Sequence, residues 1–176
     1  MRLNIIQLGD GVVDIEIKGR YFTKTERSTL TDFAEWSGQK LIGRRIMRYM
    51  QLTIQLNHPN HYKKHWLYAD TDYNDEDCRR LPRNFIVTMT SRFGMLRSLV
   101  ILAHEMVHVK QFALGELIWP EHNKYPKWFG KRINYEHTSY WDLPYEVEAH
   151  GREKGLVYQW CDERKLWKES WYRELF

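Results

Sequence analysis

Two histidines and a glutamate at a fixed spacing are the residues of this chain with the clearest chemistry. Residues 104–108 read H-E-x-x-H and directly follow the apolar run 99–103. On a helix, residues four apart lie on one face, so His104 and His108 can point both imidazoles at one ion. Glu105 stands beside them and can accept a proton from water. Together these groups are the minimum needed for zinc-assisted hydrolysis.

The residues around this motif favour a helix. Residues 92–103 contain no proline and one glycine, and the pattern can continue through Ala113 to a stop at Gly115. On a buried helix, two histidines and a glutamate would be costly polar groups unless they had partners. The pattern therefore favours a metal site over histidines that are merely packed or solvated.

A catalytic zinc ion usually takes three protein ligands and keeps one position for water, so a third ligand is expected on a second element. The best candidates lie in residues 143–150, where Pro144 suits the first turn of a helix. Glu146 and His150 are four residues apart on one face of that helix, whereas Glu148 lies on another. The spacing alone leaves all three open, and acids favour a helix's first turn even without a metal.

Residues 117–141 are rich in aromatic residues and also contain proline and glycine. This composition predicts a long structured loop, which would cross the cleft between the two metal-bearing helices. Tyrosine or protonated histidine side chains there could donate to the oxyanion of a tetrahedral intermediate, although most of the aromatics are expected to serve packing. The donor candidates are Tyr135, Tyr140, Tyr145, His122 and His137, of which Tyr140 and Tyr145 are retained with Glu105 as catalytic candidates.

Residues 92–153 resemble the small zincin-type metallopeptidases of phages that are described as SprT-like. The resemblance rests on H-E-M-V-H-V-K-Q at 104–111, K-W-F-G at 127–130 and W-D-L-P-Y-E-V-E-A-H-G-R-E at 141–153. The last segment also resembles the downstream glutamate helix of gluzincins. The resemblance implies a zinc-dependent peptidase in which Glu105 is the general base and Glu146 joins His104 and His108 as a zinc ligand.

The chain departs from the gluzincin pattern at His150. Such families often carry an aspartate at this place, where it orients a zinc-bound histidine. An imidazole cannot brace another imidazole as a carboxylate does. Either the groups behind the ligands differ here, or His150 is itself a ligand.

The expected function is hydrolysis of peptide bonds in a protein or peptide substrate by a zinc metallopeptidase. A metal-bearing assembly or virion component without turnover is an alternative, and an SprT-like protease acting on DNA-bound proteins is another. The net charge of +4 and pI near 9.0 permit contact with nucleic acid. Dispersed surface charge is the simpler interpretation of the basic clusters. A site of two histidines and a carboxylate also accepts Fe, Mn or Co.

Length and composition predict a single domain over residues 1–176 with a real core. No run is long enough to span a membrane, and the apolar stretch at the N-terminus is too short for a signal peptide. Cys78 and Cys161 form no C-x-x-C pair, which fits reduced cysteines. The expected location is the host cytoplasm or a virion, and the oligomeric state is left open.

The predicted fold class is α+β, a minimal zincin fold with a small mixed or mostly antiparallel sheet of three or four strands. Residues 1–90 would be sheet-rich, 91–160 would hold the two metal helices, and 162–175 a last helix capped by Asp162. Strands are expected at 12–18, 49–56 and 84–90 and a helix at 29–41 capped by Thr31, with residues 1–8 forming a hairpin with the first strand. Residues 85–90, or 52–56, would form a sheet edge that binds an extended peptide.

Two further clusters are expected to carry no metal. Residues 70–74 match the opening of a calcium loop, but Asp75 stands where that loop needs glycine, so a solvated acidic loop is predicted. His58, His61 and His65 cluster in sequence, but Pro59 argues against one continuous helix. Surface histidines are the simpler interpretation.

Overall fold

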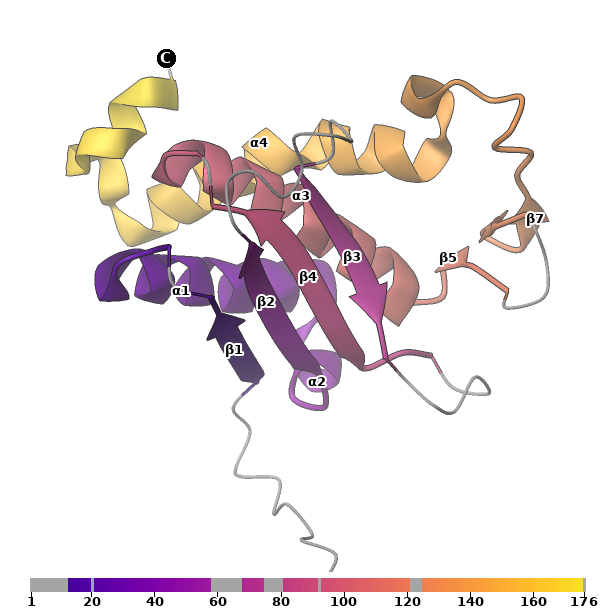
Figure 1. Cartoon of the computed structure of the whole chain (residues 1–176), viewed down its shortest axis with the longest axis horizontal. Coiled ribbons are helices and arrows are strands. Elements are labelled where there is room, and N and C mark those ends of the chain that lie inside the picture. The colour runs from indigo at the N-terminus through magenta and orange to yellow at the C-terminus, as the bar shows by residue number, and fades with distance from the viewer. Residues whose placement is uncertain are drawn as a thin grey trace, which may run out of the picture.

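The computed structural model describes residues 13–19, 21–57, 68–74, 81–91, 93–120 and 125–175. Its helices and strands, drawn in Figure 1, are β1 (Asp14–Lys18), α1 (Lys24–Leu41), α2 (Arg44–Met47), β2 (Gln51–Asn57), β3 (Ala69–Tyr73), β4 (Asn84–Thr90), α3 (Met95–Ala113), β5 (Leu117–Ile118), β6 (Lys127–Trp128), β7 (Lys131–Arg132) and α4 (Pro144–Arg164). Three short 3-10 helices complete the set: η1 (Tyr140–Asp142), η2 (Leu166–Lys168) and η3 (Ser170–Leu175).

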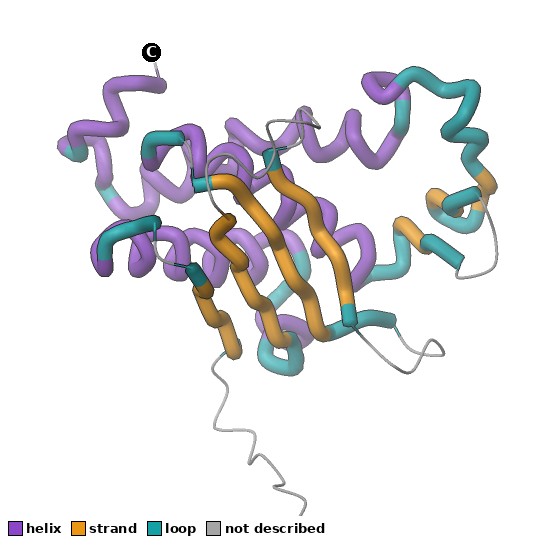
Figure 2. Tube along the Cα trace, in the orientation of Figure 1, coloured by secondary structure: helices purple, strands orange, loops and turns teal. Residues whose placement is uncertain are grey.

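The main sheet has four strands in the order β1-β2-β4-β3. The β1–β2 and β2–β4 pairs are parallel, whereas β3 pairs with β4 antiparallel. The sheet is therefore mixed, and the predicted α+β class is confirmed. Figures 1 and 2 show the helices gathered on one face of this sheet.

The two central strands supply the sheet's contribution to the core. In β2, Leu52, Ile54 and Leu56 are buried, and the residues between them are more exposed. Phe85, Val87 and Met89 in β4 follow the same alternation. This is the period of two expected for strands with one buried face. Burial of each such large apolar side chain contributes about 1.5–3 kcal/mol.

The predicted sheet edge is wrong. Both β2 and β4 lie inside the sheet, and its ends are β1 and β3. The predicted acidic loop at 70–74 is also wrong, because β3 covers Ala69–Tyr73. Asp70 and Asp72 point to the exposed side while Ala69 is buried. Pairing with β4 decided this strand, and that pairing is not visible in the local sequence.

The first helix begins earlier than predicted. It starts at Lys24 rather than near 29, and its cap is Thr23 rather than Thr31. The Thr23 side chain accepts a hydrogen bond from the Glu26 backbone N–H, and the Glu26 carboxylate accepts one from the Thr23 backbone N–H. This T-x-x-E capping box was a readable signal. Thr31 instead donates to the Arg27 carbonyl inside the helix.

The two helices that carry the H-E-x-x-H and glutamate segments form largely as predicted. Helix α3 ends at Ala113, and Gly115 follows with a φ of 70°. Helix α4 begins at Pro144 but continues to Arg164. The predicted separate helix capped by Asp162 is wrong, because Asp162 lies in the last turn of α4. The η2 and η3 turns follow Lys165, which has a φ of 57°.

The segment after α3 is structured but does not cross the cleft as predicted. Its described part contains the small sheet β5-β6-β7 and the η1 turn. Figure 1 shows this small sheet beyond the C-terminal end of α3. Leu117 packs there with Leu143 and Tyr145 in a cluster separate from the main core. Of the described residues in this segment, Tyr140 near its end reaches the site described below.

Helices α1, α3 and α4 pack around a shared core. Phe33 and Trp160 meet edge to face, with ring centroids 5.3 Å apart. The Trp160 indole N–H donates to Asp32, and the Trp36 indole N–H donates to Glu163. These contacts fix α4 against α1, so the opposite end of α4 is held in place beside α3.

Several sequence predictions lie outside the described residues: the hairpin at 1–8, His58, His61, His65, Cys78 and His122. Cys161 is a buried free thiol. Among the described residues, no helix combines the length and apolar character needed to cross a membrane.

Candidate metal centre

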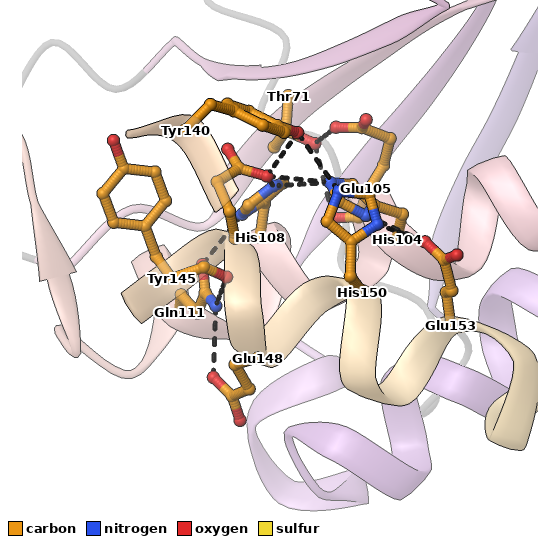
Figure 3. Close-up of polar contacts among 11 residues, drawn as sticks. Thr71, His104, Glu105, His108, Gln111, Tyr140, Tyr145, Glu148, His150 and Glu153 are labelled. Atoms are coloured by element: carbon orange, nitrogen blue, oxygen red, sulfur yellow. Dashed lines mark hydrogen bonds and ion pairs between the residues drawn. The ribbon is translucent and has the colours of Figure 1, made fainter. Parts of the chain in front are cut away.

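Helices α3 and α4 bring three ligand atoms together. His104 and His108 lie on one face of α3, with their Nε2 atoms 3.1 Å apart. Glu146, in the first turn of α4, places Oε2 3.2 Å from His104 Nε2 and 3.5 Å from His108 Nε2. Figure 3 shows the His104 and His108 side chains pointing toward one another. These two and Glu146 are the residues named from the sequence and its resemblance.

The remaining nitrogen of each imidazole has a partner that fixes the tautomer. His104 Nδ1 lies 3.1 Å from Glu153 Oε2, and a carboxylate can only accept there. His108 Nδ1 lies 2.8 Å from Gln111 Oε1. The Gln111 amide nitrogen faces two acceptors, the Tyr145 carbonyl and Glu148, so its oxygen must face His108. Both histidines therefore carry a proton on Nδ1, and Nε2 is the atom that each turns toward Glu146.

Three atoms that can each donate a lone pair to an ion converge in this arrangement, and a positive charge between them would stabilise the group. Ligand atoms around a tetrahedral zinc, each about 2.0–2.1 Å from the metal, lie about 3.3 Å from one another. The separations of 3.1, 3.2 and 3.5 Å here fit that figure. The donor set of two imidazoles and one carboxylate also suits Zn²⁺.

Without an ion, protons take the place of the cation. Burial acts to lower the pKa of His104, but hydrogen bonds to Glu146 and Glu153 outweigh it and raise this pKa to about 9. The pKa of His108 is likewise raised, since Glu146 and Glu105 overcome the effect of burial. Burial favours protonated Glu146, but the two histidines hold its pKa well below the usual range. The cluster thus attracts positive charge.

Glu153 is a residue of the candidate site whose place was not predicted from the sequence. His150 stands where gluzincins often carry the aspartate that orients a histidine. In this structure Glu153, on the next turn of α4, contacts His104 instead. Glu153 Oε2 lies 3.1 Å from His104 Nδ1 and 3.2 Å from His150 Nδ1. Glu153 stands seven residues after Glu146, the spacing of one helix face, which was the available signal.

A second polar network fixes His108 from behind. Gln111 accepts from His108 and donates to both the Tyr145 carbonyl and Glu148, so it joins α3 to α4. Glu148 Oε1 lies 2.7 Å from the buried Lys110 ammonium and 2.9 Å from Arg152. Glu148 therefore forms ion pairs with Lys110 and Arg152, and the structure does not bring it to His104, His108 and Glu146.

Glu105 lies beside the ligands and is held by the edge strand. Only 5% of Glu105 is exposed. Thr71 on β3 donates to Glu105 Oε2 at 2.7 Å. Burial raises the pKa of this carboxyl, with the positive histidines acting in the opposite direction. Glu105 is therefore a carboxyl group that can take up a proton beside His104, His108 and Glu146.

The two tyrosines named as catalytic candidates are placed differently. The Tyr140 hydroxyl donates to Glu146 Oε2 at 2.7 Å and lies 3.4 Å from His150 Nε2. Burial and the charge of Glu146 raise the pKa of Tyr140, so it stays a donor. Figure 3 shows the Tyr145 hydroxyl pointing away from the histidines. Tyr145 contributes its backbone carbonyl, and its pKa is raised to about 12, mainly by burial.

The other named donors lie apart from the site. Tyr135 packs against Trp119 and Tyr125 near the small sheet, and His137 is exposed. His150 lies closer, with its ring centroid 4.4 Å from that of His104. With Glu153 and His104 it makes a second group that could hold an ion. That group would need the His104 Nδ1 atom, which the carboxylate of Glu153 already engages.

Comparisons with models of protein families, with curated proteins and with solved structures find no match to this chain.

Proposed function

We propose that this protein is a metal-dependent peptidase with His104, His108 and Glu146 as its ligands. The observation that carries the proposal is the convergence of three possible ligand atoms, 3.1–3.5 Å apart, beside a buried carboxyl group. A divalent ion bound there would acidify a water molecule and polarise the carbonyl of a substrate. Zinc fits the donor set best.

In the proposed reaction, Glu105 transfers a proton and Tyr140 stabilises the developing negative charge. Glu105 takes the proton of the attacking water, and the new bond forms between the water oxygen and the peptide carbonyl carbon. As the C–N bond breaks, Glu105 returns that proton to the departing amine, so protons balance. The Tyr140 hydroxyl, which donates to Glu146 Oε2 in the structure, exchanges that bond for one to the oxyanion that develops on the carbonyl oxygen.

An extended peptide is the substrate class that suits the surroundings. Strand β3 is an end strand, paired only with β4 in the described sheet. Its Thr71 contacts Glu105, so the strand runs directly beside the site. The outer edge of such a strand can pair with an extended chain through backbone hydrogen bonds.

The first test is metal content. Elemental analysis of purified protein is expected to find about one divalent ion per chain, and His104→Ala is expected to lose it. A wild-type protein that binds no zinc, iron, manganese or cobalt, even when these are supplied, would contradict the proposal.

The second test separates turnover from metal binding. Glu105→Gln is expected to lower cleavage of a peptide library by at least about a thousandfold, because a buried amide cannot accept the proton. Its metal content should equal that of wild type. The matched control is Glu16→Gln on the exposed side of β1, which should keep full activity. Metal bound without cleavage of any peptide would favour an assembly component instead.

A further inference from the structure

The most exposed large apolar side chain among the described residues lies beside the candidate metal centre. It is Trp141, in the η1 turn, and 68% of this residue is exposed. Tryptophan is highly buried on average in folded proteins, and its ring carries a large apolar surface. A partner that covers the Trp141 ring gains the free energy of removing that surface from water.

Ring contacts connect Trp141 to the candidate ligands. The Trp141 ring centroid lies 5.0 Å from that of His150, with 36° between the ring planes. The His150 centroid in turn lies 4.4 Å from that of His104. The ring of Tyr140 lies 5.3 Å from that of Trp141, and the Tyr140 hydroxyl donates to Glu146. One side chain therefore separates Trp141 from each of two proposed ligands.

The neighbours of Trp141 line a cleft with a volume of about 670 Å³. Tyr140 and His150 line it together with His104 and Glu105. Because Trp141 packs on the first two of these rings and is itself mostly exposed, it lies at the edge of the cleft. A cleft of this size accommodates several residues of a peptide. A peptide that reaches Glu105 can therefore also cover the indole.

The backbone around Trp141 is already fixed in the structure. The Asp142 N–H donates to the Ser139 carbonyl, and the Leu143 N–H donates to the Tyr140 carbonyl. Leu143 is buried in the small apolar cluster beside α4. A ring held in this way can bind a ligand at a low cost in conformational entropy.

The surroundings of Trp141 favour an apolar ligand. Val147 lies one turn before His150 on the same face of α4, and 53% of it is exposed. On α3, Val100 and Ile101 make part of the cleft lining apolar. A large apolar side chain gains from these aliphatic groups and from the indole, whereas a cation gains only from the indole face.

We propose that Trp141 binds a large apolar side chain of the peptide substrate close to the cleaved bond. The inference rests on the proposed peptidase function and adds a substrate specificity to it. An extended peptide rises about 3.3 Å per residue. The ring distances of 5.0 and 4.4 Å therefore place Trp141 within about three residues of His104 along such a peptide. Trp141 selects Phe, Tyr, Leu or Met at one position in that range.

The first test measures kcat/KM of the zinc-loaded protein for peptides that differ at one position. A mixed library identifies a cleaved sequence, and Phe, Ser and Lys are then placed in turn at each position within about three residues of the bond. We expect a preference of about tenfold for Phe over Ser at one position. Equal rates for Phe and Ser throughout, or a preference for Lys, would overturn the apolar site.

Variants of Trp141 test whether its ring is responsible. Trp141→Ala should lose the preference through a higher KM with kcat nearly unchanged, because the ring binds the substrate and the transition state alike. Trp141→Phe should keep most of the preference. The matched control is Trp167→Ala: Trp167 in η2 is 45% exposed and is not among the described residues that line the cleft. Circular dichroism and metal content verify that each variant is folded. A preference that survives in Trp141→Ala would overturn the proposal.

A probe that is not cleaved separates this inference from the proposed function. N-acetylphenylalaninamide is titrated into protein that carries fluorotryptophan, and fluorine NMR follows each indole, with the signal of Trp141 assigned from its absence in Trp141→Phe. We expect the Trp141 signal to shift and the Trp167 signal to stay, whereas N-acetylserinamide should shift neither. A shift at Trp141 without cleavage of any peptide would support the site and remove the peptidase. Cleavage without a shift at Trp141 would overturn the site and leave the peptidase intact. If neither is observed, both are wrong.

Discussion

At the scale of single residues, Glu153 is the side chain that bonds to the outer nitrogen of His104. Its carboxylate accepts from His104 Nδ1, which fixes the tautomer and makes the ligand nitrogen more basic. Burial opposes ionisation of Glu153, but the hydrogen bond from His104 keeps the pKa of this carboxyl below its usual value. The negative charge is therefore present at neutral pH.

Glu153→Gln tests this role. The amide keeps a hydrogen-bond acceptor at the same place but removes the charge, so the affinity for zinc is expected to fall about 10–100-fold. Competition with a chromogenic chelator measures the affinity. The same exchange at Glu16 on β1 serves as control and should leave the affinity unchanged. An unaltered affinity in Glu153→Gln would mean that the carboxylate does not orient His104.

At the scale of elements, the site depends on how α4 is fixed along its whole length. Its first turns meet α3 through Gln111 and Glu148, and its last turns meet α1 through Asp32. Asp32 accepts from the Trp160 indole N–H at 2.9 Å and from two nitrogens of Arg164 at 3.0 and 2.9 Å. These bonds join the far end of α4 to the core.

Asp32 gives a prediction about stability and pH. The hydrogen bonds from Arg164 have the largest effect on the pKa of Asp32, and they lower it. Burial acts to raise this pKa, but the hydrogen bond from Trp160 also lowers it, so the pKa lies below its usual value. In the unfolded chain the pKa of an aspartate is about 3.9. Because the pKa of Asp32 is lower in the folded protein, its charge stabilises the fold at a pH above about 3.9, and this stabilisation is lost as the pH falls through the pKa of the folded protein. Asp32→Asn should therefore lower the free energy of unfolding by about 1 kcal/mol at pH 7, a modest figure because the pair is partly exposed.

Urea unfolding of metal-free wild type and Asp32→Asn at pH 7 and at pH 3.5 measures this difference. The gap between the two proteins should narrow at the lower pH. A gap of the same size at both values would show that Asp32 acts through packing or neutral hydrogen bonds rather than through its charge.

Strand β3, which was predicted to be a loop, lies beside Glu105. It is an end strand of the described sheet, and it carries the contact from Thr71 to Glu105. The local sequence of β3 favours an acidic loop, because Asp is rare in strands. The pairing with β4 and the burial of Ala69 decided its conformation.

At the scale of the whole molecule, the metal group lies beside a core that does not depend on it. The buried apolar cluster extends through β1, α1, β2, β4, α3 and α4. The ligands stand at its margin, where His104 and Glu146 side chains each remain 12% exposed. The fold therefore has its own source of stability, unlike a small domain organised around a structural zinc.

Removal of metal should accordingly leave the protein folded. With a chelator, the far-UV circular dichroism is expected to persist while the melting temperature falls. Zinc at about 100 times its Kd should stabilise the fold by about 2.7 kcal/mol, a rise of about 5–10 °C for a chain of this size. His104→Ala should show no such rise. Loss of the helical signal on chelation would instead mark the metal as structural.

The sequence by itself determined that His104 and His108 share one face of a helix, and it determined the two helices and the alternating strands β2 and β4. These depend on local spacing: four residues for His104 and His108, and two for buried strand positions. Only the tertiary structure decided that Glu153 bonds to His104, that β3 is an end strand of the described sheet and that the hydroxyl of Tyr140 rather than that of Tyr145 reaches the site. Each of these depends on contacts between elements distant in the chain, and such packing overrides local preference.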